Sequence, residues 1–237
     1  MASSRRNLQQ VREVISSAHK DCEPAQKLQF YDQWAQEYEE DVSVLEYNAP
    51  RLAASALASM YISDQESKLV LDVACGTGLV AQELRRYGFG LFHGVDGSKG
   101  MLQVAKNKNV YQELKQCMLG QEPLPFPTDT YDAVVIVGAL SDGQAPVSVI
   151  PELVRVTKSG GFLCLTTRSN RSNLQYKAEL ECELTALQKS GLCECVAIHN
   201  VEDWEKATSE QEAQGNADYI PGVIYLYKKR MSIPLPD

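Results

Sequence analysis

The chain has 237 residues, of which 44% are hydrophobic and 23% charged, and its formal net charge is −8 at pH 7. This length suits one large α/β domain with added elements, and the composition excludes a disordered chain. Proteins that bind phosphate backbones usually present a basic face, so the acidic balance disfavours nucleic acid as the direct substrate and favours a small molecule or a protein.

The seven cysteines show no paired CxxC spacing, so we interpret them as free thiols in a reducing compartment and expect no metal site. The N-terminus lacks an apolar leader segment, and no run of about 18 apolar residues occurs in the chain. These features predict a protein of the cytoplasm, or of the nucleus, that does not span a membrane.

The first 62 residues are expected to form an N-terminal helical cap. Tyr31, Trp34 and Tyr38 recur at the spacing of one helical face, which predicts a helix over residues 25–40. The stretch before this helix is polar and shows only weak helical spacing. The sequence therefore predicts a small helical region ahead of the main body of the protein.

Strands alternate with helices in the core predicted for residues 63–237. Short apolar runs predict seven strands, at residues 69–73, 90–95, 116–119, 131–137, 162–166, 196–198 and 223–227. Helical spacing predicts helices at residues 53–60, 79–87, after Ser98, at 147–157 and at 174–189. This alternation implies βαβ units with right-handed crossovers, and hence an α/β fold with a doubly wound, mostly parallel seven-stranded sheet.

A glycine-rich turn follows the first predicted strand. Gly76 and Gly78 would let the backbone approach a nucleotide at the carboxyl edge of the sheet, where open α/β folds bind ligands. Because Gly76-x-Gly78-x-x-Ala81 also satisfies the dinucleotide fingerprint, the loop alone does not identify the cofactor.

Asp72 ends the first strand just before this turn. Its charge would repel a pyrophosphate bound there, whereas it would attract the ammonium at the amino-acid end of S-adenosylmethionine. Asp72 therefore favours S-adenosylmethionine over a dinucleotide, and a structural role in capping the loop is the alternative.

A second carboxylate, Asp96, ends the second predicted strand twenty positions after Gly76. That spacing is expected for a residue that accepts hydrogen bonds from ribose hydroxyls, so Asp96 indicates a nucleoside without choosing the cofactor. The alternative is that Asp96 only caps the following helix.

Five segments in this order resemble the class I methyltransferase family. They are Leu-Asp-Val-Ala-Cys-Gly-Thr-Gly at 71–78, Val-Asp-Gly-Ser at 95–98, Leu-Pro-Phe-Pro at 124–127, Tyr-Asp-Ala-Val-Val at 131–135 and Lys-Ser-Gly-Gly at 158–161. The segment Tyr31-Asp32-x-Trp34-Ala35-x-x-Tyr38 also resembles the entry segment of small-molecule and orphan members.

The resemblance implies a Rossmann-like fold and S-adenosylmethionine as cofactor, with S-adenosylhomocysteine as product. Carried over position by position, it implies the cofactor-binding residues Tyr31, Trp34, Tyr38, Asp72, Ala74, Cys75, Gly76, Gly78, Asp96, Gly97, Ser98, Met101, Gly120, Gln121, Val137 and Gly138.

Two positions depart from the family pattern. Ala74 replaces the first glycine of the loop, which keeps a small residue there. Gly120 stands where members often carry the acidic residue that receives the adenine amino group. Gln121 or a backbone carbonyl would have to take over that contact.

The aromatic N-terminal helix allows two interpretations. Three large rings on one face suit a cationic sulfonium and a flat adenine, which favours a lid that closes over the cofactor. An amphipathic helix buried against the sheet would show the same stripe.

Methyl transfer from a sulfonium is an in-line displacement, so the protein chiefly aligns the reactants and needs a base only for a protonated nucleophile. Accordingly no catalytic residue is assigned, and His19, His93 and His199 are expected to be structural. Asp142, Arg168 and Asn170 are weaker candidates for contacts with a small-molecule or protein acceptor.

The acidic stretch Glu202–Glu212 is expected to be a solvated helix or loop, and a binding role is the alternative. The alternatives to a methyltransferase are a cofactor-binding protein without turnover and a nicotinamide-dependent oxidoreductase.

Overall fold

The computed structural model describes residues 6–18, 23–208 and 218–231. The helices are α1 (Leu8–Ala18), α2 (Pro24–Trp34), α3 (Tyr38–Val44), α4 (Ala49–Ala58), α5 (Leu79–Arg86), α6 (Lys99–Asn107), α7 (Ile150–Val156) and α8 (Leu174–Lys189), with 3-10 turns η1 (Gln65–Ser67), η2 (Val147–Val149) and η3 (Arg171–Asn173). The strands are β1 (Leu69–Val73), β2 (Leu91–Asp96), β3 (Glu113–Gln116), β4 (Tyr131–Ile136), β5 (Thr157–Arg168), β6 (Cys193–Lys206) and β7 (Tyr219–Lys229).

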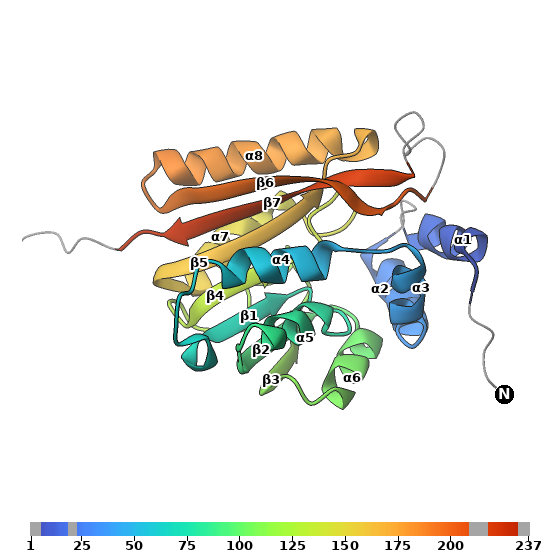
Figure 1. Ribbon diagram of the computed structural model, residues 1–237, viewed down its shortest axis with the longest axis horizontal. Helices are drawn as coiled ribbons and strands as arrows, with labels where there is room; N and C mark the ends of the chain where they lie inside the picture. The colour runs from blue at the N-terminus through green and yellow to red at the C-terminus, as the bar shows by residue number, and fades with distance from the viewer. Residues whose placement is uncertain (1–5, 19–22, 209–217, 232–237) are drawn as a thin grey trace, which may run out of the picture.

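These strands form one seven-stranded sheet in the order β3-β2-β1-β4-β5-β7-β6 (Figure 1). The strands β1 to β5 pair in parallel, and β7 runs antiparallel between β5 and β6. The chain reverses its direction of winding between β1 and β4, and ligands of open α/β sheets bind in the crevice at such a switch point. The predicted doubly wound, mostly parallel sheet with helices at its N-terminus is confirmed.

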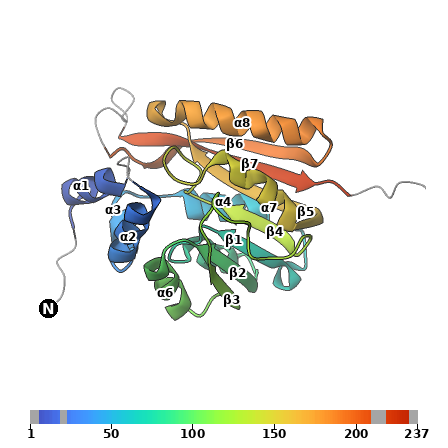
Figure 2. The same ribbon diagram turned by 180° about the vertical axis from the view of Figure 1, so that it is seen from behind.

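Alternate residues of the strands feed two apolar clusters on opposite faces of the sheet. On β4, Val134 and Ile136 belong to the cluster under α7 and α8, whereas Ala133 and Val135 belong to the cluster under α4 and α5. Figures 1 and 2 show these helix pairs from the two sides. A sheet buried on both faces explains why its central strands are apolar throughout.

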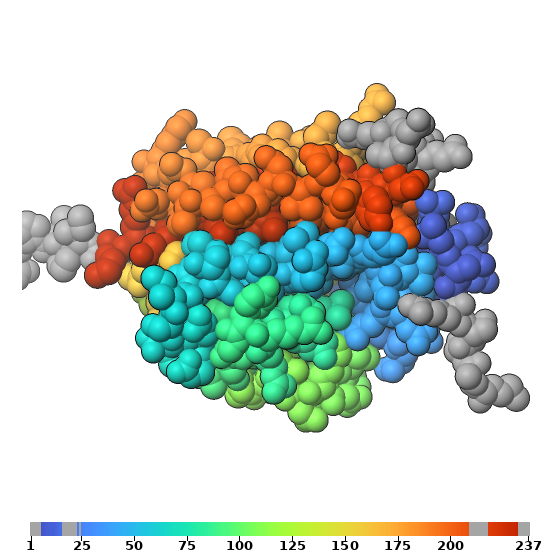
Figure 3. Space-filling model, viewed as in Figure 1, coloured from blue at the N-terminus to red at the C-terminus, as the bar shows by residue number. Residues whose placement is uncertain are grey.

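The helices α1 to α3, called the cap here, lie at one end of the molecule (Figures 1 and 3). Their own apolar cluster is built on Val11, Ile15, Trp34 and Leu45. The helix α4 packs instead with the sheet, because its buried alanines belong to the cluster that covers one sheet face. The placement of a domain boundary at residue 62 therefore stays a prediction.

The predicted helix over residues 25–40 is broken in the structure, because α2 ends at Trp34 and α3 begins at Tyr38. In a continuous helix, residues seven positions apart are separated by about 10 Å along the axis. The break brings the Trp34 indole to the buried Asp41 carboxylate, to which its N–H donates a 2.7 Å hydrogen bond.

Two further expectations need correction. The third strand comes earlier than predicted, at Glu113–Gln116, and residues 117–119 continue as a loop. The first part of the acidic stretch, up to Lys206, belongs to the long strand β6 and not to a solvated helix or loop. The remaining acidic residues beyond position 208, and His19, lie outside the described residues.

Candidate functional site

A cavity of about 420 Å³, called the larger cavity here, opens at the carboxyl edge of β1, β2 and β4. Its lining combines the loops that follow these strands with side chains of the cap. Of the residues predicted for the cofactor, it is lined by Tyr31, Tyr38, Ala74, Gly76, Asp96, Gly97, Met101, Gly120, Gln121, Val137 and Gly138. The structure thus brings together residues that are far apart in the sequence.

In the loop after β1, every second residue from 74 to 78 has a positive φ. Ala74, Gly76 and Gly78 have φ values of 53°, 53° and 92°, and the Gly78 N–H donates to the Cys75 carbonyl at 2.8 Å. A Cβ at Gly76 would meet no atom within 4 Å. Because Gly76 also lines the larger cavity, its missing side chain leaves room for a ligand against the backbone.

Asp96 joins the loops after β1 and β2. Its carboxylate accepts hydrogen bonds from the backbone N–H groups of Gly76 and Ser98, both at 2.8 Å. Burial raises the pKa of Asp96, and these N–H donors lower it in part. The carboxylate therefore lines the cavity in a fixed position, as a ribose acceptor requires.

Asp72 lies beneath the loop and does not line the larger cavity. Its side chain is buried, and the Tyr111 hydroxyl donates to it at 2.7 Å. Burial raises the pKa of Asp72 to about 7, against the effect of the Tyr111 hydrogen bond. Tyr111 was not predicted, because it pairs with a residue 39 positions earlier in the chain.

Three other predicted cofactor residues do not line the larger cavity and contact other parts of the protein. Ser98 is buried, and its hydroxyl accepts from the Met101 N–H at 3.1 Å, so it caps the helix that was predicted to follow it. A Cβ at Gly78 would lie 3.0 Å from the Tyr111 ring, so this glycine makes room for that ring. Cys75 is buried, and its burial raises the pKa of the thiol.

The departure at Gly120 has a physical explanation. Gly120 has a φ of 79°, and a Cβ there would lie 2.4 Å from the Pro146 ring. An acidic side chain at this position would need a strained backbone and a displaced proline. The exposed Gln121 lies beside it at the cavity.

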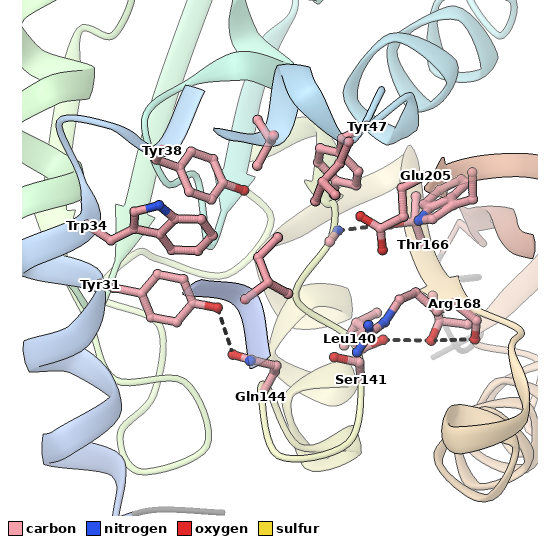
Figure 4. Close-up of a pocket in the computed structure, with 16 residues that line it drawn as sticks. Tyr31, Trp34, Tyr38, Tyr47, Leu140, Ser141, Gln144, Thr166, Arg168 and Glu205 are labelled. Atoms are coloured by element: carbon pink, nitrogen blue, oxygen red, sulfur yellow. Dashed lines mark hydrogen bonds between the residues drawn. The ribbon is translucent and has the colours of Figure 1, made fainter. Parts of the chain in front are cut away.

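A second cavity of about 80 Å³, called the smaller cavity here, adjoins the larger one. The two share Tyr31, Tyr38, Gly138 and Gln144 as lining residues. Trp34, which was predicted to bind the cofactor, lines only the smaller cavity. Figure 4 shows the aromatic rings of the cap on one side of the smaller cavity, with Arg168 and Glu205 across from them.

Gly138 lines both cavities and lies against Tyr47, which lines the smaller one. Gly138 has a φ of 75°, and a Cβ there would lie 2.1 Å from the Tyr47 hydroxyl. Only glycine allows this approach of a hydroxyl group to the backbone. Tyr47 was not predicted, because the residue has no sequence neighbour in any recognised motif.

Of the weaker acceptor candidates, only Arg168 lines the smaller cavity. Asp142 is exposed, and Asn170 is buried beside β5. Glu205 and Trp204, which come from the acidic stretch on β6, line the smaller cavity and were missed by the sequence analysis. Trp204 lies against Gly222 of β7, and its carbonyl accepts from the Asn48 N–H, so no local pattern identifies this position.

Helix α2 joins the cap to the loop after β2 and to the start of α6. The Asp32 carboxylate accepts hydrogen bonds from the Ser98 hydroxyl at 2.6 Å and from the Gly100 N–H at 2.8 Å. Ser98 lies two positions after Asp96 in the chain. This contact therefore links the cap to the loop that holds the predicted ribose acceptor.

The described residues contain no group of three or more His, Cys, Asp or Glu side chains that could hold a metal ion. Among the same residues, no helix has the length and apolar character needed to cross a membrane.

Comparisons with known proteins identify the family. Residues 71–165 match the methyltransferase domain family. The chain is 56% identical to human methyltransferase-like protein 27 over 188 residues, which cover 79% of this chain and 76% of that protein. It is 38% identical to a demethylmenaquinone methyltransferase of Symbiobacterium thermophilum over 105 residues, which cover 40% of this chain and 41% of that enzyme.

A solved structure has a similar fold. The structure of a SAM-dependent methyltransferase from Thermotoga maritima superimposes with a TM-score of 0.55 at 18% identity, over 85% of this chain and 98% of that one. The chain belongs to the class I S-adenosylmethionine-dependent methyltransferase family.

Proposed function

We propose that this methyltransferase binds S-adenosylmethionine in the larger cavity and transfers its methyl group to an acceptor held in the smaller cavity. The observation that carries the proposal is the junction of the two cavities at Gly138, between a glycine loop with a fixed carboxylate and an aromatic pocket. A donor and an acceptor placed in adjoining cavities meet the alignment that in-line displacement requires.

The residues of the larger cavity fit this cofactor. Asp96 would accept hydrogen bonds from the ribose hydroxyls, and the open space at Gly76 would receive the ligand against the backbone. Gln121 and backbone groups beside Gly120 would bound the adenine. Asp72, behind the loop, would act on the cationic amino-acid end through its charge and not by lining the cavity.

When bound, the cofactor supplies a methyl group that is already activated on a sulfonium. The protein's own residues then have two tasks, which are to align the acceptor and to exclude water. Tyr31 and Tyr38 line both cavities, so the cap is placed to do both. The family membership does not favour the nicotinamide-dependent alternative.

Calorimetry with S-adenosylmethionine, S-adenosylhomocysteine and NADH tests the first part. We expect both sulfur compounds to bind and NADH to remain unbound, and the reverse pattern would refute the proposal. The second part is tested by incubation with methyl-labelled donor and with separate small-molecule and protein fractions of a cell extract. Binding without label in either fraction would identify a cofactor-binding protein without turnover.

A further inference from the structure

The residues shared by the two cavities mark the place where the methyl group would pass. Among the described residues, those that line both cavities are Tyr31, Tyr38, Gly138 and Gln144. In the proposed function the nucleoside of the donor lies in the larger cavity and the acceptor in the smaller one. The sulfur atom that carries the methyl group then lies where the cavities join. Two tyrosine side chains of the cap therefore border it.

The orientation of these two tyrosine rings is set by Trp34. The centroid of its ring lies 6.0 Å from that of Tyr31 and 4.9 Å from that of Tyr38, and the second pair meets edge to face. Trp34 is buried, and its N–H donates to Asp41 at 2.7 Å. Figure 4 shows the three rings along one wall, with both tyrosine hydroxyls directed toward the cavity. The cap thus presents an ordered aromatic wall to the junction.

The hydroxyl groups of this wall are open to a ligand. The Tyr31 hydroxyl donates to Gln144 over 3.4 Å, which is long for a hydrogen bond, and the Tyr38 hydroxyl makes no hydrogen bond with the described residues. Burial raises the pKa of Tyr31 to about 12, and it also raises the pKa of Tyr38. Both groups are therefore neutral at pH 7, and each retains oxygen lone pairs.

Carboxylates give the same place a negative potential. After burial, the charge of Asp96 is the largest cause that raises the pKa of Tyr31, and Glu205 adds to it. Both carboxylates also raise the pKa of Tyr38. A negative potential that disfavours the ionised phenol favours a cation at the same position.

Two cationic side chains border the cavities but not their junction. Arg168 lines only the smaller cavity, and it lowers the pKa of Tyr31 by less than Asp96 raises it. Lys27 lines only the larger cavity, where its ammonium donates to the Gly143 carbonyl. Among the described residues, the junction is therefore bordered by neutral aromatic and amide side chains in a negative potential.

We infer that Tyr31 and Tyr38 distinguish the cationic donor from the neutral product, so that S-adenosylmethionine binds more tightly than S-adenosylhomocysteine. A cation is attracted by the faces of aromatic rings, most strongly where water is excluded. A neutral thioether gains nothing from this attraction. The inference rests on the proposed function, because it takes the larger cavity as the donor site.

The distinction would favour release of the product. During transfer, the acceptor forms a bond to the methyl carbon, the carbon–sulfur bond breaks, and its electron pair stays on sulfur. The positive charge leaves the sulfur and passes to the acceptor with the methyl group. The tyrosine wall then borders a neutral thioether, which it holds less tightly, and new donor displaces it.

Calorimetry on the unchanged protein tests the inference with three ligands. They are S-adenosylmethionine, S-adenosylhomocysteine and sinefungin, in which a carbon bearing an ammonium group replaces the methylated sulfur. We expect both cationic ligands to bind at least about fivefold more tightly than S-adenosylhomocysteine. Equal affinities, tighter binding of S-adenosylhomocysteine, or a preference for only one of the two cations would overturn the inference.

Variants then test the two rings. Tyr31→Leu and Tyr38→Leu should each lower the ratio of the Kd of S-adenosylhomocysteine to that of S-adenosylmethionine by about twofold or more. Because the ratio compares two ligands on one variant, a general loss of binding does not change it. Tyr87→Leu is the matched control, since Tyr87 is exposed at the end of α5 and lines neither cavity. An unchanged ratio in both cap variants would overturn the assignment to these rings.

The same measurements separate the inference from the proposed function. If the unchanged protein binds none of the three ligands, the proposed function fails. If it binds all three without preferring the cations, or if the two cap variants behave like Tyr87→Leu, donor binding stands and only the inference fails.

Discussion

The cap and the sheet form opposite walls of the same cavities, but they are held by different kinds of contact. The sheet is enclosed by two apolar clusters that extend across its faces. The cap has one small cluster built on four buried residues, and it reaches the larger cavity through polar contacts such as those of Asp32. Few buried apolar contacts mark the regions of a fold that open most readily.

The two walls therefore suit different tasks. The sheet wall carries the glycine loop and Asp96, whose positions are fixed by backbone hydrogen bonds. The cap wall carries Tyr31 and Tyr38, which border both cavities. A rigid wall that holds the donor and a less stable wall that closes over it would allow exchange of ligands and exclusion of water in turn. Five predictions test this contrast.

The largest effect is expected at the sheet wall, for Asp96→Ala. The variant loses a charged acceptor for ribose hydroxyls, worth about 1.5–3 kcal/mol per hydrogen bond, and releases the N–H groups of Gly76 and Ser98. We expect S-adenosylmethionine and S-adenosylhomocysteine to bind roughly 100-fold more weakly by calorimetry. Asp203→Ala on β6 serves as an exposed control. Unchanged affinity in Asp96→Ala would remove the ribose assignment.

The buried carboxylate under the sheet wall should make stability depend on pH. The pKa of Asp72 is about 7 in the folded protein and ordinarily 3.8, so between these values the folded state binds the extra proton. The free energy of unfolding should therefore fall as pH rises, by about 2 kcal/mol between pH 5 and pH 7. Urea titrations of the ligand-free protein measure this fall.

Asp72→Asn should remove most of this slope, because the amide does not titrate, whereas Asp203→Asn should keep it. A slope that is the same in Asp72→Asn and in the unchanged protein would show that another group is responsible. It would also mean that burial does not raise the pKa of Asp72 as described.

Hydrogen exchange compares the two walls directly. If the cap is a lid, amides of residues 25–45 exchange fast in the free protein and at least tenfold more slowly with S-adenosylhomocysteine, whereas β4 (Tyr131–Ile136) stays slow in both states. Equal protection of the cap in the two states would mean that it is a fixed scaffold, and the contrast between the walls would then be wrong.

The contact between the walls should have a smaller effect. Asp32→Ala removes the acceptor of the Ser98 hydroxyl and of the Gly100 N–H. Because Asp32 is exposed, we expect S-adenosylhomocysteine to lose about 1 kcal/mol of binding free energy, which makes its binding roughly fivefold weaker. Glu40→Ala is an exposed control within the cap. A loss as large as that of Asp96→Ala would mean that the cap contributes as much binding energy as the sheet.

The sheet wall was predictable because its signals are local. The turn at Gly76 and the carboxylate Asp96 each follow an apolar strand, and parallel strands end at a common edge, so the sequence places both residues together. The cap wall was predicted only in part. The spacing of Tyr31, Trp34 and Tyr38 is helical, but the break after Trp34 depends on a buried partner, Asp41, that periodicity does not reveal.

The position of Glu205 in the smaller cavity was least predictable. Glu205 comes from an acidic stretch whose composition is typical of a solvated surface, and it reaches the cavity because β6 continues past a register shift to Lys206. Pro146 likewise explains Gly120 only once the two meet in space. These contacts depend on pairings between distant segments, which neither spacing nor composition encodes.

The smallest effect is expected in the glycine loop itself, for Ala74→Gly. Ala74 has a φ of 53°. This conformation costs a residue with a Cβ about 1 kcal/mol, whereas it costs glycine little. Glycine also gains more freedom in the unfolded chain, which offsets part of the gain. We therefore expect the free energy of unfolding to rise by less than about 1 kcal/mol in urea titrations. Ala81→Gly, within α5, should lower it instead, because glycine is unfavourable inside a helix. If Ala74→Gly also lowers the free energy of unfolding, Ala74 adopts this φ without strain. The fixed loop of the sheet wall would then not lower the stability of the protein at this position.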